Sequence, residues 1–439
     1  MKRILAAGIV VALALLVILW IAAPALTAGS RAGAPEPAGT SGTALTVALY
    51  PYFDDVNEDG HAATIALLKE KYHERYPDDD VEIFISPDMN PYMENSDNLS
   101  ALFAAGAPDL AEVEQTELDN LIAGGYIRPF PADTAEEREI LQNTLGDVVG
   151  PYRTIGIQNG SVYFIPTWLC ALYTFSRVPS GTAPEAADFS QSTVLPDLYL
   201  SAYASMYGTD PKLLKEASRN AAAGSPDPAV IASLASRISA CTGSTGENRC
   251  LDGYYSGHGT ATDDFGAGIT DRYSGYSETL YWILREHPEV RNETLAITGT
   301  SFGRNDSPSL AWVDGFVINN YTDPKKIDQA LRFVNFYNSV EAREIIALAK
   351  DTGAGRERVP RYLLPASESF YRLEEVSDDP YYRQFSPVIR NMTPFPTGGL
   401  RGNMMNIYCP VIRALNATGL EADLQPCASA ARPLASSVS

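Results

Sequence analysis

Cysteine carries the most reactive side-chain chemistry in this sequence, which contains five cysteines. One of them, Cys170, lies in the apolar and aromatic stretch NGSVYFIPTWLCALYTFSR. Cys241 and Cys250 flank the turn-like segment TGSTGENR, and Cys409 and Cys427 lie on either side of a short helical stretch near the C-terminus. The economical pairing joins Cys241 to Cys250 and Cys409 to Cys427, although four cysteines allow three connectivities. Cys170 is then left over, either as a small buried hydrophobe or as a reactive thiol.

A reactive thiol needs a base, because the thiolate is the attacking species. The chain has only four histidines, none in a motif with Cys170: His61, His73, His258 and His287. A cysteine/histidine peptidase would need one of them within reach of the thiol. A carboxylate can replace histidine if burial raises its pKa toward neutrality. Glu114, Glu278 and Asp314 stand in apolar or aromatic settings and are the candidates, unless each is an N-cap or part of a buried ion pair.

A metal site is not expected. Asp55, Asn57, Asp59 and Gly60 spell the first half of a calcium-binding loop, but the twelfth position is Ala66 instead of a bidentate glutamate. The segment runs directly into a helix, whose N-terminus tolerates acidic residues without any metal. We therefore predict neither a metal nor a cofactor.

The N-terminus predicts export. Lys2 and Arg3 precede an uncharged apolar run over residues 4–23, which is typical of a secretory signal. The run is also about long enough to span a bilayer, so an uncleaved N-terminal anchor is the alternative. We assign residues 1–30 to the signal peptide or anchor and the Gly/Ser/Pro/Ala-rich residues 31–43 to a flexible linker. The protein would then be secreted or extracytoplasmic, where disulfides persist.

The net charge of −21 narrows the choice of partners. Such a surface repels nucleic acid and anionic lipid and modestly favours cationic small molecules, while solubility alone could also explain it. We expect small-molecule substrates, no nucleic acid, membrane contact only through an uncleaved N-terminal segment, and a monomer.

The elements that must position these side chains indicate an α/β fold. A strand over residues 45–53, an amphipathic helix over 61–76 and a strand over 81–86 form a βαβ opening, and hence a parallel sheet. Residues 180–240 have helical periodicity. The length from 44 to 427 favours two lobes. We place lobe 1 at about 44–165 plus 300–345, lobe 2 at about 166–299 plus 346–427, and a disordered tail at 428–439.

Three motifs make the chain resemble the type II periplasmic solute-binding fold, which has a ligand cleft between two lobes. The first is G-Y-I-R-P-F at 125–130 and the second is G-S-V-Y-F-I-P at 160–166. In the third, Asp323-Pro324 precedes the helix pattern A-L-R-F-V-N-F at 330–336.

Within that superfamily, the chain looks most similar to thiamine pyridinylase, also called thiaminase I, from about residue 45 to about residue 375. The most specific matches are the segment ending P-T-W-L-C at Cys170 and G-Y-S-E at 275–278. Further matches are Y-P-Y at 50–52, W-V-D at 312–314 and Y-L-L-P-A at 362–366.

The resemblance implies a mechanism. Cys170 matches the nucleophile that adds to C6 of the thiamine pyrimidine, and Glu278 matches the acid/base that activates the thiol. The thiazole leaves, and an organic base or thiol takes its place on the methylene bridge. Tyr50, Tyr52 and Tyr276 match aromatic residues that line the pyrimidine site.

The remaining pocket positions both match and depart from the family pattern. Asp314 matches an acid that can contact the aminopyrimidine. Glu114 stands where the family usually has aspartate, and Trp312 where it often has tyrosine. The alternative function is that of an extracellular solute-binding protein serving a transporter, which would hold its ligand without turnover.

Overall fold

The computed structural model describes most of the chain between residues 44 and 429. The described stretches are 44–50, 61–85, 97–178, 184–243, 247–256, 260–300, 310–353, 357–398 and 404–429. The segment expected to direct export, the linker after it and almost all of the C-terminal tail lie outside these stretches, as does the incomplete calcium-loop motif at 55–60. Among the described residues, no helix is both long and apolar enough to cross a membrane.

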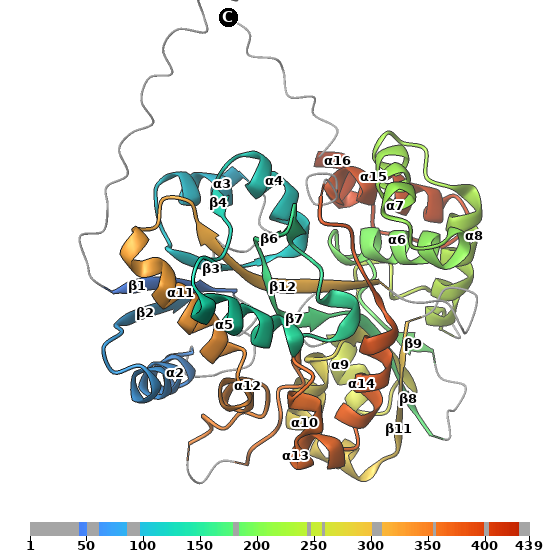
Figure 1. Ribbon diagram of the computed structural model, residues 1–439. Helices are drawn as coiled ribbons and strands as arrows, with labels where there is room; N and C mark the ends of the chain where they lie inside the picture. The colour runs from blue at the N-terminus through green and yellow to red at the C-terminus, as the bar shows by residue number, and fades with distance from the viewer. Residues whose placement is uncertain are drawn as a thin grey trace, which may run out of the picture. The chain divides into compact units, whose positions relative to one another are not determined.

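A mixed sheet forms the centre of the first lobe (Figure 1). Its strands run in the order β13-β7-β12-β3-β1-β2, and β4 and β14 also pair with β12. The expected βαβ opening is confirmed, because β1 is parallel to β2 with α2 between them, and β3 is parallel to β1 on its other side. The strands are β1 (Leu45–Leu49), β2 (Val81–Ile85), β3 (Leu110–Glu114), β4 (Ile127–Arg128), β7 (Ile165–Cys170), β12 (Leu310–Asn319), β13 (Leu364–Pro365) and β14 (Thr393–Pro394).

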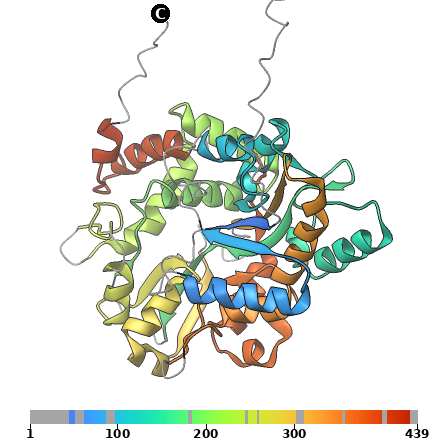
Figure 2. The same cartoon turned by 90° about the vertical axis from the view of Figure 1, so that its left-hand side faces the viewer.

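Helices cover both faces of this sheet, with α3 and α4 on one side and α2, α5, α11 and α12 on the other (Figures 1 and 2). Local sequence explains where several of them begin. A capping box between Thr134 and Glu137 opens α5, and Asp323 caps α11 just before Pro324. The helices are α2 (Ala62–Arg75), α3 (Asp97–Ala104), α4 (Leu118–Ala123), α5 (Ala135–Gly146), α11 (Pro324–Tyr337) and α12 (Val340–Ala347).

A second sheet, in the order β11-β8-β10-β9, forms the centre of the other lobe. Its strands are β8 (Leu172–Arg177), β9 (Glu185–Ala186), β10 (Arg272–Tyr276) and β11 (Leu295–Gly299). The helical region expected over 180–240 is present as α6, α7 and α8, against which α15 packs. The helices of this part are α6 (Val194–Tyr207), α7 (Pro211–Ala222), α8 (Pro228–Ile238), α9 (Thr260–Gly266), α10 (Thr279–Glu286), α13 (Glu374–Asp378), α14 (Tyr382–Asn391), α15 (Met404–Asn416) and α16 (Gln425–Ser429).

The chain passes directly from one sheet to the other at Ala171, between β7 and β8. It returns between β11 and β12, and it crosses again after β13 and on either side of β14, because β13 and β14 pair in the first sheet while α14 packs on β11 and α15 on α6, α7 and α8. The residue ranges that we assigned to each lobe stay a prediction. The strand that carries Cys170 nevertheless ends one residue before the crossing, which puts the thiol where the two sheets meet.

Both predicted disulfides are present. Cys241–Cys250 closes a short loop after α8, and Cys409–Cys427 joins α15 to α16. Cys170 is the free cysteine. The odd cysteine inferred from the sequence is therefore also the unpaired one in the structure.

Candidate active site

A cavity of about 300 Å³ lies between the two sheets and is lined from both. This volume is at the lower end of the range for small-molecule sites. Every predicted catalytic or substrate-binding residue that the structure describes lines it, whereas Tyr52 falls outside the described stretches. The lining residues are Tyr50, Glu114, Trp168, Leu169, Cys170, Gln191, Thr193, Tyr276, Glu278, Trp312, Asp314, Leu363 and Leu364.

Strand register gathers the part of the lining that belongs to the first sheet. In the antiparallel pairing of β7 with β12, Cys170 lies opposite Trp312 and Trp168 opposite Asp314. In the pairing of β12 with β3, Asp314 lies opposite Glu114. Residues directly opposite one another share a face of the sheet, so these five side chains form one surface. Glu114 ends β3, which places this surface at the carboxyl end of the parallel strands, where α/β sheets bind ligands.

The second sheet supplies Tyr276 and Glu278. Tyr276 ends β10, and Glu278 occupies the N-cap position of α10. The Ser277 hydroxyl donates to Glu278 Oε2 at 3.3 Å, and the Thr279 hydroxyl donates to the Tyr276 carbonyl at 2.5 Å. The positive end of α10 favours a carboxylate at this position. The G-Y-S-E segment is therefore a fixed turn that presents a tyrosine and a carboxylate to the cavity.

The thiol of Cys170 is protonated at rest. Burial raises its pKa well above the ordinary value, and the negative charges of Glu278, Asp314, Glu114 and Asp197 raise it further, Glu278 most among the charges. The thiol cannot attack as a preformed thiolate. Its proton must pass to a base during attack, and Glu278 is the charged group that raises the pKa of the thiol most.

Histidine does not supply that base among the described residues. The described lining contains no histidine, lysine or arginine. His61 and His73 belong to the start and the last turn of α2, and His287 follows α10 beside Asp263 and Glu289. His258 lies outside the described stretches. The three histidines that can be placed give no support to a cysteine/histidine peptidase.

Trp312 forms a fixed wall of the cavity. Its indole Nε1 donates to Asp197 Oδ2 at 2.8 Å, and its ring stacks on Phe395 with centroids 3.8 Å apart and planes 15° apart. Asp197 comes from α6, so this hydrogen bond joins the two lobes beside the site. Sequence reasoning missed Asp197 and Phe395, because no local pattern marks a contact between segments so far apart in the chain.

Other parts of the lining were also missed. Gln191 and Thr193 precede α6, and the Gln191 amide donates to Asp188 Oδ2 at 2.8 Å. Leu363 and Leu364 come from the Y-L-L-P-A motif, which carries part of the family resemblance but did not predict a place in the lining. The polar pair offers hydrogen bonds to a ligand, and the two leucines offer apolar contact.

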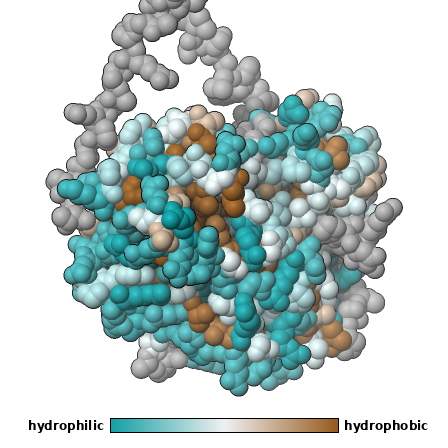
Figure 3. All heavy atoms as spheres, viewed as in Figure 1, coloured by the Kyte–Doolittle hydropathy of each residue, from teal (hydrophilic) through white to brown (hydrophobic). Residues whose placement is uncertain are grey.

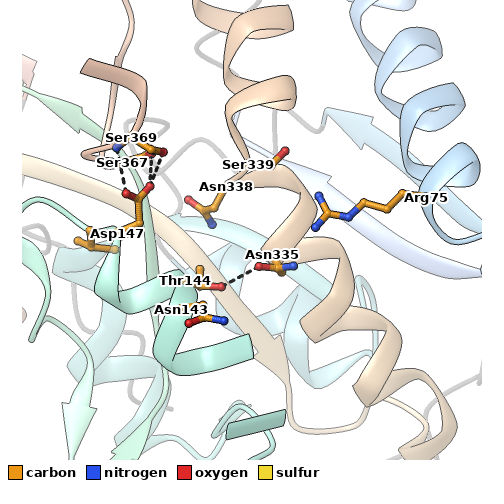
Figure 4. Close-up of a pocket in the computed structure, with 10 residues that line it drawn as sticks. Arg75, Asn143, Thr144, Asp147, Asn335, Asn338, Ser339, Ser367 and Ser369 are labelled. Atoms are coloured by element: carbon orange, nitrogen blue, oxygen red, sulfur yellow. Dashed lines mark hydrogen bonds between the residues drawn. The ribbon is translucent and has the colours of Figure 1, made fainter. Parts of the chain in front are cut away.

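A second cavity, of about 180 Å³, is lined almost entirely by polar side chains (Figure 4). In it, Asp147 accepts hydrogen bonds from the hydroxyls of Ser367 and Ser369 at 2.5 and 2.6 Å and from the Ser369 backbone at 2.9 Å. These bonds fasten the segment that follows β13 to the end of α5. The described lining of this cavity contains no cysteine.

Comparisons with known proteins find similar solved structures, and these establish the fold. The sequence matches no family model and no curated protein. Thiaminase I from Bacillus thiaminolyticus is 17% identical, with a TM-score of 0.59 over 85% of this chain and 99% of that chain. Clostridium botulinum thiaminase I, solved in complex with thiamin, is 16% identical, with a TM-score of 0.63 over 85% of this chain and 100% of that chain.

A maltodextrin-binding protein from L. casei, solved without ligand, is 15% identical, with a TM-score of 0.58 over 88% of this chain and 97% of that chain. At these identities the likeness establishes the fold alone. The expected fold class is confirmed: the chain has the two-lobed α/β fold of type II periplasmic binding proteins, a fold that thiaminase I shares.

Proposed function

We propose that this protein is a transferase of the thiamine pyridinylase type, which displaces the thiazole of thiamine by an organic base or thiol. The observation that carries the proposal is a free thiol, Cys170, in the same cavity as the carboxylate of Glu278. A protein that only binds its ligand has no need of a thiol beside an acid. Structures of thiaminase I, one of them solved with thiamin, share the fold.

The chemistry of the lining suits thiamine, which is a cation with two aromatic rings. Glu114, Glu278 and Asp314 supply negative charge, and Tyr50 and Tyr276 supply aromatic surface. Stacking, cation–π attraction and charge complementarity then act together on the same ligand. Closure of the lobes over the ligand would exclude water from the reacting atoms.

The proposed reaction assigns each proton and bond. The sulfur of Cys170 adds to C6 of the pyrimidine while its proton passes to Glu278. Asp314 contacts the aminopyrimidine. The bond between the methylene carbon and the thiazolium nitrogen breaks, and the thiazole leaves as a neutral base. The incoming base or thiol bonds to the methylene carbon, and a thiol loses its proton to solvent as it does so. Cys170 then leaves C6 and takes its proton back from Glu278.

The setting of the protein is also part of the proposal. Two disulfides support an extracytoplasmic location, since such bonds persist in oxidising compartments. We propose that residues 1–30 direct export and that the mature protein is a secreted or N-terminally anchored monomer acting on small molecules.

A second candidate is an extracellular solute-binding protein without catalysis. The specific observation in its favour is that a maltodextrin-binding protein matches the fold about as well as thiaminase I does. In that case the cavity would retain thiamine or another solute, and Cys170 would have no chemical role.

One experiment separates the two candidates. Purified protein comprising residues 44–439 is incubated with thiamine and excess pyridine or aniline, and free thiazole is measured by chromatography. We expect release by the wild type, loss of release in Cys170→Ser, and a decrease in kcat of about 10²–10⁴-fold in Glu278→Gln. The absence of release from the wild type, with tight retention of a solute by both wild type and Cys170→Ser, would favour the binding protein.

A further inference from the structure

The strand that carries Cys170 contains a β-bulge three residues before the thiol. In the pairing of β7 with β12, Trp168 lies opposite Asp314 while Pro166 lies opposite Gly315, so Thr167 is the extra residue. A bulge bends its strand and changes which side chains share a face. Side chains alternate between the two faces of a strand, so one extra residue moves every later side chain to the opposite face. Thr167 therefore decides which face of the sheet Cys170 occupies.

A buried carboxylate holds the bulge. The hydroxyl of Thr167 donates to Glu112 Oε1 at 2.5 Å, and the other oxygen of Glu112 accepts from the backbone N–H of Tyr50 at 3.2 Å. Glu112 and Thr167 are both 0% exposed. Tyr50 and the end of β7 each line the cavity. A single carboxylate beneath the cavity thus ties together two of its walls.

The backbone opposite the bulge is packed too closely for any side chain. A Cβ on Gly315 would lie 2.5 Å from the Ile165 carbonyl oxygen and 2.5 Å from the ring of Phe164. Thr167 is also held from the other side, because its carbonyl accepts from the Ala366 backbone at 2.8 Å. The bulge is therefore braced by three separate segments of the chain.

We infer that Glu112 is a positioning residue that acts through Thr167 to place the sulfur of Cys170 relative to Glu278. This inference rests on the proposed function. Glu112 is not among the described residues that line the cavity. Because its two side-chain oxygens accept from Thr167 and from the Tyr50 backbone, one side chain holds the irregular strand against a neighbouring wall of the cavity. Sequence alone does not mark Glu112, because its partners lie on β1 and β7.

The test compares Thr167→Val, which keeps the shape and removes the hydroxyl, with Thr167→Ser, which keeps the hydroxyl. Thr322→Val is the matched control, because Thr322 is also buried and its hydroxyl donates to a backbone carbonyl at 2.8 Å, beyond the other end of β12. Three quantities are measured: kcat and KM for thiazole release, and the apparent pKa of Cys170 from the pH dependence of its alkylation by iodoacetamide.

In Thr167→Val, we expect kcat to decrease roughly 100-fold, since a displacement of about 1 Å at a reacting centre has effects of this size. KM should change little, because the tyrosines and carboxylates of the cavity remain. The apparent pKa of Cys170 should decrease, since a displaced thiol is less buried and farther from Glu278. Thr167→Ser should keep the wild-type kcat and the wild-type apparent pKa of Cys170. Thr322→Val should change neither value.

Should Thr167→Val fail to fold, Glu112→Met provides a second comparison, because methionine has nearly the length of glutamate and lacks both acceptor oxygens. The inference is overturned if folded Thr167→Val or Glu112→Met keeps the wild-type pKa of Cys170, or if Thr322→Val reproduces the loss. Alkylation needs no turnover. A wild type that releases no thiazole would therefore refute the proposed function, while the alkylation profiles would still decide the role of Glu112.

Discussion

At the scale of single residues, the site combines a protonated thiol with several carboxylates. Burial and the charges of Glu278, Asp314 and Glu114 all raise the pKa of Cys170. A thiol of this kind is protected from adventitious oxidation and alkylation at neutral pH, because the thiolate is the reactive form. In the proposed reaction it becomes a nucleophile when a substrate is positioned and a carboxylate accepts the proton.

The raised pKa of Cys170 predicts opposite effects of Glu278→Gln on alkylation and on turnover. Removing a negative charge that disfavours the thiolate should lower the apparent pKa, so alkylation by iodoacetamide at a fixed pH of about 8 should be faster than in the wild type. Thiazole release should be slower, because the base is lost. Identical alkylation profiles in the two proteins would contradict the electrostatic role assigned to Glu278.

Trp312→Phe should lower the free energy of unfolding by removing a hydrogen bond beside the cavity. Phenylalanine can still stack on Phe395, but it cannot donate to Asp197. Removing a donor from a buried acceptor costs about 1–3 kcal/mol, which urea unfolding would measure. Trp282→Phe is the control, because Trp282 is only partly buried on α10 and should cost less. An equal cost for both substitutions would show that the bond to Asp197 contributes nothing.

At the scale of elements, two consecutive strands, β7 and β8, connect the first sheet to the second beside the cavity. β7 brings the thiol that we propose as the nucleophile, and β8 begins the second sheet after a single residue, Ala171. The turn before α10 then brings Glu278 from β10, which pairs directly with β8. The acid and the thiol are therefore close because of a short connection and one antiparallel pairing.

The disulfide between α15 and α16 should stabilise the fold without contributing to the chemistry. Replacing Cys409 and Cys427 together by alanine should lower the free energy of unfolding by about 3 kcal/mol, given the length of the loop that they close. Neither helix contributes a described residue to the lining of the cavity, so kcat for thiazole release should be unchanged below the unfolding transition. A large loss of kcat in the folded variant would show that these helices reach the site.

At the scale of the whole molecule, the charge distribution favours cationic substrates. The net charge is −21, and hydrophilic residues cover most of the face shown in Figure 3. The cavity adds its own carboxylates to this field. A negative field attracts a cation such as thiamine from a distance, and it acts far less on a neutral co-substrate.

Salt should therefore weaken the reaction with thiamine. Raising the NaCl concentration from about 0.05 M to about 0.5 M should lower kcat/KM for thiamine several-fold, because the Debye length falls below 10 Å. The dependence of the rate on aniline, which is neutral, should not change when thiamine is saturating. A kcat/KM for thiamine that is independent of salt would contradict electrostatic attraction as a contributor.

The sequence by itself determined the local features of this protein. Residue periodicity indicated the βαβ opening and the helices over 180–240, and cysteine spacing indicated both disulfides. These features follow from contacts within a few turns or strands, which composition and spacing record directly. Recognisable motifs also indicated seven residues that line the cavity: Tyr50, Glu114, Cys170, Tyr276, Glu278, Trp312 and Asp314.

Only the tertiary structure decided how these residues meet. The opposition of Cys170 to Trp312 depends on strand register, and register depends on the bulge at Thr167. Glu112 and Asp197 act through partners that lie far away in the chain. Such contacts leave no periodic trace in the sequence, because packing between distant segments, and not local propensity, selects them.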